Sequence, residues 1–359
     1  MNITIVGGGN VGTQFAVHCA EKKHQVIIFG SKPKAFHDLL YIIDESAEIR
    51  HKGKIIEATS DPERAFAKAE LIFVTMPSFC MRDVAEQIFP YVRPDVMIGL
   101  IPGTGGGECA FRKCLDKGAV VFGLQRVPSV ARLVEYGKSV CAIGYREKLH
   151  IAALPYKYTE KVCELIYSIF DIRCEKLPNY LNVTLTPSNP ILHTTRLKTI
   201  FSDYYPGKYY DSLPLFYEDW TDESSVLLLA CDDEVQQICK KLSRFDLSGV
   251  ISLRKHYESS SIEEMTKKIS GIKGFQGLET PAVRTEKGFI PDLQSRYFIA
   301  DFSYGLTILT QIADFAGVEA INLKETLMWY QNIIQQKKGF DYGDYAIRND
   351  KDFMSFYIR

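Results

Sequence analysis

The 359-residue sequence has no C-x-x-C pair, no excess of charge of one sign and no long apolar run. Its nine cysteines are scattered, and the closest pair, Cys109 and Cys114, has no histidine cluster beside it. An odd, unpatterned set of this kind indicates reduced thiols rather than disulfides or zinc. We therefore predict a cytoplasmic protein without a metal site.

Charge and hydropathy exclude further classes of protein. Lys and Arg number 43 and Asp and Glu 44, and this balance gives no general reason to expect nucleic-acid or membrane binding. No apolar run is long enough to span a bilayer, and a strand beginning at Asn2 leads us to expect no signal peptide. A hydrophobic content of 46% provides the core of an ordinary globular protein with two domains or one large one.

What the sequence does contain is a glycine-rich turn within residues 2–12. A β-branched run enters a G-x-G-x-x-G pattern at Gly7, Gly9 and Gly12. Gly7 permits a tight strand-to-helix turn, and Gly9 lets a pyrophosphate approach the backbone. Gly12 lets the helix lie close to the strand. The pattern predicts a dinucleotide-binding turn.

The surroundings of the turn matter, because a lone G-x-G-x-x-G is weak evidence. The turn opens an amphipathic segment, residues 11–22, and leads into a second strand, residues 25–29. The amides of Asn10 and Val11 begin this helix, where the helix dipole favours a negatively charged phosphate. A merely structural turn is the alternative, but the strand–turn–helix context favours a Rossmann site.

The second strand ends without the acidic residue that usually binds the ribose hydroxyls of NAD. Gly30 stands at that position, followed by Ser31, Lys32 and Lys34. A hydroxyl and two ammonium groups suit a 2′-phosphate, so we favour NADP over NAD, which remains the second choice. The alternative is that the lysines simply form a solvated helix start.

The first half alternates strand-like and helix-like segments, which indicates a doubly wound, mostly parallel sheet. Ligands of such sheets bind beyond the carboxyl ends of the strands, so Pro77 and Gly103 are predicted to lie near the cofactor. A plain flexible loop is the alternative for the glycines at 103–107. The predicted strands are residues 54–58, 71–75, 96–101, 119–124, 140–144 and 172–176, and the helices are 62–68, 82–91 and 108–117.

After residue 178 the pattern becomes mainly helical. We predict a Rossmann domain over residues 1–178 and an all-α domain over residues 179–359. The tail at 337–359 is charged and rich in aromatic residues, and no role is assigned to it. The predicted helices are residues 181–186, 226–242, 262–269, 304–315 and 320–335.

Two segments of the second half carry polar groups suited to chemistry. Asn189 and His193 are four residues apart, so they share one face of a helix. Arg296 and Asp301 flank an apolar stretch at 297–300. Each segment also has a structural explanation: Ser188, Asn189 or Asp301 can serve as a helix N-cap, and a lone histidine is more often structural than catalytic.

Taken together, these segments resemble the octopine/nopaline (opine) dehydrogenase family over roughly residues 2–335. The sequence departs from the family at residues 124–129, where an acidic or hydroxyl-rich loop is expected, and at Thr194, which replaces a frequent proline. The matching motifs are Asn189 with His193, Arg296-Tyr297-Phe298 with Asp301, Gly305-Leu306, and a glycine stretch at 102–107 followed by Phe111-Arg112-Lys113.

The resemblance implies a Rossmann domain joined to a helical domain and a reductive condensation that uses NAD(P)H. An α-keto acid and the amino group of an amino acid would be joined, and these small molecules are the expected partners; a homodimer is a possible assembly. The resemblance further implies that His193 is the general acid/base, oriented by Asp301. It also implies that Asn189 and Arg296 bind substrate, Arg296 as a fork for a carboxylate.

Two other functions stay open at this point. A ketopantoate-reductase-like enzyme would share Asn189-Pro190, but Leu181 and Leu185 stand where that family expects a lysine and an asparagine. A non-catalytic module that senses NADPH is the second alternative, and the presence of both His193 and Asp301 argues against it. The aromatic residues within 203–220 could line an amino-acid pocket, although packing between helices is the favoured interpretation.

Overall fold

The apolar runs of the first half form an eight-stranded sheet in the computed structural model, which describes residues 1–187, 189–336 and 339–359. The strand order is β12-β11-β8-β7-β6-β1-β2-β5, and every pair is parallel except β11 with β8. The predicted mostly parallel sheet is therefore confirmed. The strands are β1 (Asn2–Val6), β2 (Gln25–Phe29), β5 (Glu57–Thr59), β6 (Leu71–Val74), β7 (Met97–Leu100), β8 (Val120–Leu124), β11 (Lys148–Leu154) and β12 (Arg173–Lys176).

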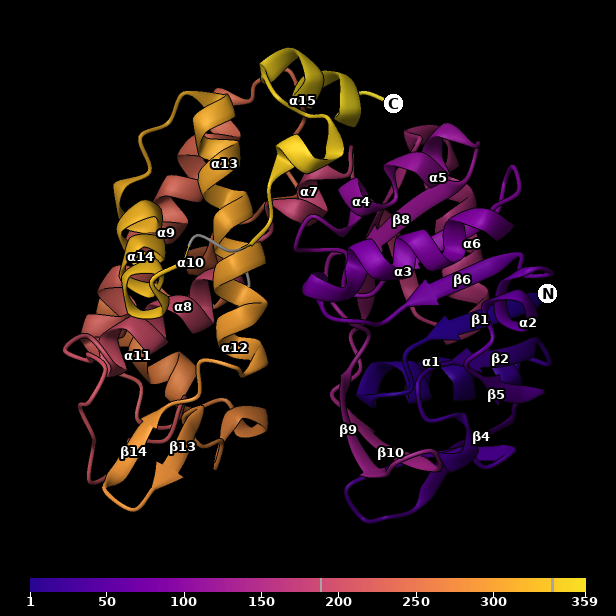
Figure 1. Cartoon of the computed structure of the whole chain (residues 1–359), viewed down its shortest axis with the longest axis horizontal. Coiled ribbons are helices and arrows are strands. Elements are labelled where there is room, and N and C mark those ends of the chain that lie inside the picture. The colour runs from indigo at the N-terminus through magenta and orange to yellow at the C-terminus, as the bar shows by residue number, and fades with distance from the viewer. Residues whose placement is uncertain (188, 337–338) are drawn as a thin grey trace. The chain divides into compact units, whose positions relative to one another are not determined.

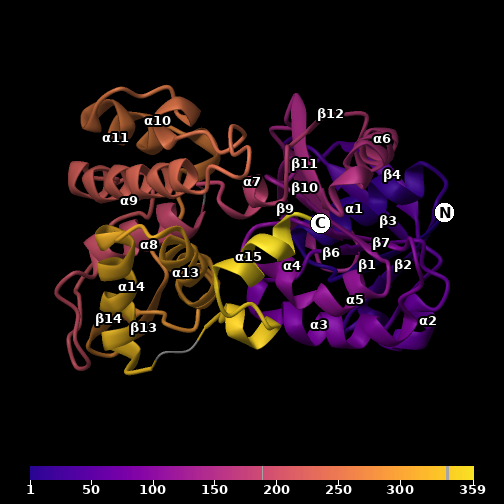
Figure 2. The same ribbon diagram turned by 90° about the horizontal axis from the view of Figure 1, so that it is seen from above.

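Helices cover both faces of this sheet (Figures 1 and 2). Helices α1 (Asn10–Glu21) and α6 (Thr159–Phe170) lie on one face. Helices α2 (Pro62–Phe66), α3 (Met81–Ile88) and α5 (Arg112–Asp116) lie on the other. This two-sided cover explains why the central strands are apolar throughout rather than alternating.

A second sheet of four strands was not predicted, and it packs against α1 in the order β4-β3-β10-β9. It corrects the amphipathic assignment of residues 11–22, because Thr13, Gln14 and His18 are buried beneath it. The single strand predicted at 54–58 is also wrong, since β4 ends at Lys54 and β5 begins only at Glu57. The strand predicted at 140–144 belongs to this second sheet. Its strands are β3 (Leu39–Ile43), β4 (Ile49–Lys54), β9 (Val130–Glu135) and β10 (Ser139–Ile143).

The last residues of the chain belong to the same unit as the Rossmann sheet, which comprises Met1–Thr184 and Ser355–Arg359. The Tyr357 hydroxyl donates to the buried Glu108 carboxylate at 2.7 Å, and the Thr184 hydroxyl donates to the same oxygen at 2.6 Å. Burial raises the pKa of Glu108, and these two hydrogen bonds oppose that rise. The tail without a predicted role therefore supplies part of this buried network.

The second unit, Leu185–Met354, is mainly helical and carries one unpredicted hairpin, β13 (Ala282–Thr285) with β14 (Gly288–Pro291). In Figure 1, α12, a π-helical segment and α13 run on as one rod. No helix in the described ranges has the length and apolar character that a bilayer span requires. The helices of the second unit are α8 (Asn189–Ile200), α9 (Asp222–Lys241), α10 (Leu253–His256), α11 (Ile262–Ser270), α12 (Arg296–Ile299), the π-helical segment (Asp301–Leu306), α13 (Thr307–Ala316), α14 (Ile321–Ile334) and α15 (Asp350–Tyr357). The last residues of α15, from Ser355 on, belong to the first unit.

Candidate active site

The predicted cofactor turn lies between β1 and α1, and each of its three glycines is at a position with a different steric requirement. Gly7 has a φ of +96°, a conformation that side chains disfavour. A Cβ on Gly12 would lie 1.8 Å from the Gly7 carbonyl oxygen, so only glycine lets α1 begin this close to the strand. A Cβ on Gly9 would meet nothing within 4 Å. The open space over Gly9 fits the close approach of a pyrophosphate to the backbone.

The other predicted cofactor residues are held in the same unit. The Asn10 side chain accepts a hydrogen bond from the Leu133 amide at 2.8 Å, and Val11 is half-buried in the first turn of α1. Pro77 lies just after β6, half-buried. Gly103 is buried, its amide donates to the Leu124 carbonyl, and its carbonyl accepts from a tyrosine hydroxyl. The structure thus gives Gly103 a packing role, and cofactor contact by it stays a prediction.

The end of β2 is open where an acidic residue would normally stand. A Cβ on Gly30 would meet no atom within 4 Å, and the side chains of Ser31, Lys32 and Lys34 are exposed. In the described ranges neither lysine forms an ion pair, so both ammonium groups are available to an anion. Ser31, Lys32 and Lys34 therefore form an accessible cationic edge at the end of β2.

In the second unit, α8 and the π-helical segment pack together and bring His193 to Asp301. A Cβ on Gly305 would lie 2.6 Å from Cγ of Pro190, so the glycine permits this close packing. The Gly305 amide donates to the carbonyl of Ala300, five residues back, as a π-helical turn requires. The Gly-Leu step of the sequence motif therefore has a steric reason.

His193 is only 3% exposed and is hydrogen-bonded through both ring nitrogens. Its Nδ1 lies 2.7 Å from Oδ2 of Asp301, and its Nε2 lies 2.6 Å from the Tyr217 hydroxyl. Because a carboxylate can only accept, Nδ1 is the protonated nitrogen of the neutral ring, and the Tyr217 hydroxyl then donates to Nε2. Asp301 thus determines the tautomer and orientation of the histidine.

Tyr217 is a residue that the sequence analysis did not select. Its ring stacks on Phe275 with centroids 4.2 Å apart, and burial raises its pKa, a rise that the positive charge of Arg296 opposes. The buried Arg196 donates to the backbone carbonyls of Leu215, Phe216 and Asp219 and so holds the turn that carries Tyr217. The aromatic richness of residues 203–220 was the available signal, but it does not single out one ring.

The two predicted substrate-binding residues lie at helix starts and are exposed. Asn189 begins α8, one turn before the buried His193, and Arg296 begins α12. The guanidinium of Arg296 lies 6.0 Å from the centroid of the Tyr297 ring, which itself lies 4.4 Å from the His193 ring. In the described ranges Arg296 has no ion-pair partner. The cap predicted at Ser188 lies outside the described residues.

Comparison with known proteins identifies relatives of both parts of the chain. The model of the "NAD/NADP octopine/nopaline dehydrogenase, alpha-helical domain" family matches residues 176–334, and that of the "NAD-dependent glycerol-3-phosphate dehydrogenase N-terminus" matches residues 2–105. Tauropine dehydrogenase of Arabella iricolor is 24% identical over 92% of this chain and 91% of its own. Opine dehydrogenase of Haliotis discus hannai is 27% identical over 82% and 78%.

Among solved structures, octopine dehydrogenase with NADH and L-arginine superposes with a TM-score of 0.85 at 21% identity, covering 99% of this chain and 98% of that one. The fold and the matched domains define an NAD(P)-dependent oxidoreductase with a Rossmann domain and a helical domain. Residues 176–334 carry the helical domain of the octopine/nopaline dehydrogenase family.

The cationic edge at the end of β2 predicts a cofactor preference that one substitution reverses. The unmodified protein should bind NADPH more tightly than NADH, because Ser31 and Lys32 follow the end of β2, where Rossmann folds bind the ribose of the cofactor. Gly30→Asp places a carboxylate in open space, where it repels that phosphate and accepts from ribose hydroxyls. Fluorescence titration with both cofactors measures this, and tighter NADH binding by the unmodified protein would rule the preference out.

Proposed function

We propose that this protein uses NADPH to join an α-keto acid to an amino acid, with His193 and Asp301 as its acid–base pair. The observation that carries the proposal is the buried hydrogen bond between Nδ1 of His193 and Asp301 at 2.7 Å. A histidine is suited to this work because it can both give and take a proton near neutral pH. The nine cysteines are all unpaired thiols, which supports a reducing compartment such as the cytoplasm.

The reaction balances as keto acid, amino acid, NADPH and one proton giving a secondary amine dicarboxylate, NADP⁺ and water. When bound, the cofactor supplies the hydride. The amine first adds to the carbonyl carbon. His193 then donates a proton from Nε2 to the former keto oxygen, which leaves as water. Asp301 stabilises the imidazolium that precedes this transfer, as carboxylates do in hydrolase triads.

The Tyr217 hydroxyl is hydrogen-bonded to Nε2 of His193, the nitrogen through which this proton must pass. A substrate oxygen reaches Nε2 of His193 only when the Tyr217 hydroxyl moves aside or passes the proton on itself. The 2.6 Å contact supports an active role for this hydroxyl, since it already hydrogen-bonds Nε2, the nitrogen from which the proton leaves. We therefore include Tyr217 with His193 and Asp301 in the proposed site.

The charged and polar groups around this network suit a substrate carboxylate. Arg296 offers a planar fork that can hold both oxygens of a carboxylate. Its exposure and its lack of an ion-pair partner in the described ranges leave that fork available. Asn189, one helical turn before His193, is the second proposed substrate contact.

Turnover with paired substrates tests the proposed function. NADPH oxidation should require both a keto acid and an amino acid, across a panel that tests each keto acid with and without amines. Turnover on a keto acid alone would instead indicate a hydroxy-acid reductase. Cofactor binding without turnover on any combination would indicate a non-catalytic sensing module, so each of these outcomes rejects the proposal.

A double-mutant cycle tests the His193–Asp301 pair. Loss of a general acid typically costs about 10²- to 10⁴-fold in rate, so His193→Ala should lose activity on that scale while still binding NADPH. Asp301→Asn should also be severely impaired, because an amide cannot stabilise the imidazolium. The double variant should be little worse than His193→Ala. Rate penalties that simply multiply would show two independent residues.

A further inference from the structure

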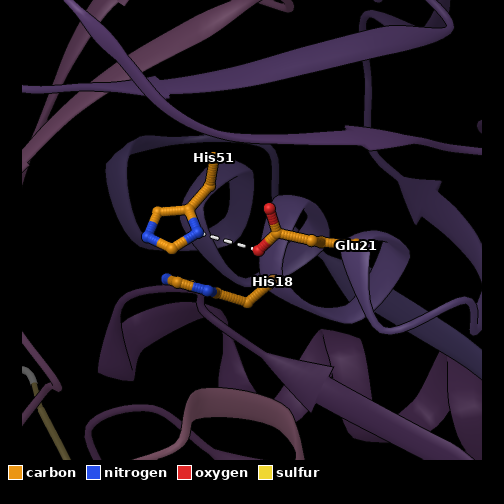
Figure 3. Close-up of side chains that lie close together, drawn as sticks. All are labelled: His18, Glu21 and His51. Carbon is orange, nitrogen blue, oxygen red and sulfur yellow. Dashed lines mark hydrogen bonds and ion pairs between the residues drawn. The ribbon is translucent and has the colours of Figure 1, made fainter.

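Three metal-ligating side chains meet on the first unit, apart from the glycine turn. His18 and Glu21 lie near the end of α1, and His51 reaches them from β4 (Figure 3). One ligand atom from each lies within 4.8 Å of the other two. Nδ1 of His51 is 2.8 Å from Oε2 of Glu21, and the rings of His18 and His51 are 4.8 Å apart between centroids.

The packing of β4 on α1 holds this cluster together. A Cβ on Gly53 would lie 2.6 Å from the Val17 carbonyl oxygen and 2.8 Å from the Ala20 side chain. Only glycine therefore allows β4 to lie this close to the helix, and His51 stands two residues before it. Backbone packing, and not only a surface ion pair, brings His51 over α1.

A second set of hydrogen bonds orients His18. Its Nε2 lies 3.0 Å from the Tyr145 hydroxyl, which also accepts from the Gln14 amide at 3.3 Å. When Nε2 donates to that hydroxyl, the lone pair of the ring is on Nδ1, as in metal-binding histidines whose other nitrogen is tied to a neighbour. Burial, with the nearby His51 and Lys22, lowers the pKa of His18.

We propose that His18, Glu21 and His51 form a binding site for a divalent transition-metal ion of the zinc, nickel and copper class. Two imidazoles and a carboxylate are the donors that such ions prefer, with water completing the coordination. Bonds of about 2.0–2.1 Å to a tetrahedral ion place ligand atoms about 3.3 Å apart, so the widest pair must approach by at most roughly 1.5 Å. Rotations of the Glu21 and His51 side chains, which lie partly in solvent, provide this movement.

The site is structural in character. His18 lies eight residues along α1 from Asn10, which is roughly 12 Å at the helical rise, so a bound ion does not touch the cofactor phosphates. The ion would instead link α1 to β4 and fasten the second sheet to the helix that carries the glycine turn. Binding to the folded state alone stabilises that state by mass action.

Metal titration of the tag-free, chelator-treated full chain tests this proposal. Zn²⁺ in competition with a chromogenic chelator should show one tight site per chain and should raise the Tm. Co²⁺ should give absorption bands of a nitrogen- and oxygen-ligated ion without thiolate charge transfer. His51→Gln, on the partly exposed strand, should weaken Zn²⁺ binding at least tenfold, and Glu21→Gln should weaken it in the same direction.

His150→Gln is the matched control, because His150 also pairs with a glutamate, Glu175, at 3.2 Å but has no second histidine in that pair. It should leave the affinity and the Tm shift unchanged. Equal Zn²⁺ affinity in the unmodified protein and His51→Gln would overturn the proposal. A chain that binds none of Zn²⁺, Ni²⁺ and Cu²⁺, or a Co²⁺ complex with thiolate bands, would overturn it as well.

Discussion

The close packing of the π-helical segment on the start of α8 is the contact on which the chemistry of this protein depends. Gly305 leaves room for Pro190, and this approach places Asp301 within 2.7 Å of His193. A carboxylate at that distance determines which ring nitrogen carries the proton. An isolated histidine would be only a buried polar group, whereas the oriented ring is a group able to deliver a proton.

The first unit also contains glycines that allow two elements to pack closely where a side chain would clash. Gly12 lets α1 begin directly under the Gly7 carbonyl, and Gly53 lets β4 lie across the same helix. Helix α1 is consequently buried between two sheets, and its polar residues Gln14 and His18 find partners inside the unit rather than in water. Its start faces the predicted cofactor, while its end carries the proposed metal site.

The features that were predictable from the sequence are those with local causes. The glycine turn, the buried parallel strands and the helical second half follow from short-range patterns, whereas His193 and Asp301 were selected by the resemblance of their motifs to a known family. The second sheet was missed because it joins two local strand pairs, β3 with β4 and β9 with β10, through the long-range pairing of β3 with β10. Tyr217, Arg196 and the buried contact of Tyr357 depend on long-range packing in the same way, and so does the meeting of His51 with His18.

The protonation of His193 tests the central claim most directly. Nitrogen-15 NMR of the histidine side chains, with His193 assigned by its loss in His193→Ala, distinguishes a protonated ring nitrogen from an unprotonated one. The account predicts that the neutral ring of His193 carries its proton on Nδ1, facing Asp301, and accepts at Nε2 from Tyr217. A neutral ring protonated at Nε2 would contradict it, because Asp301 would then not orient the histidine.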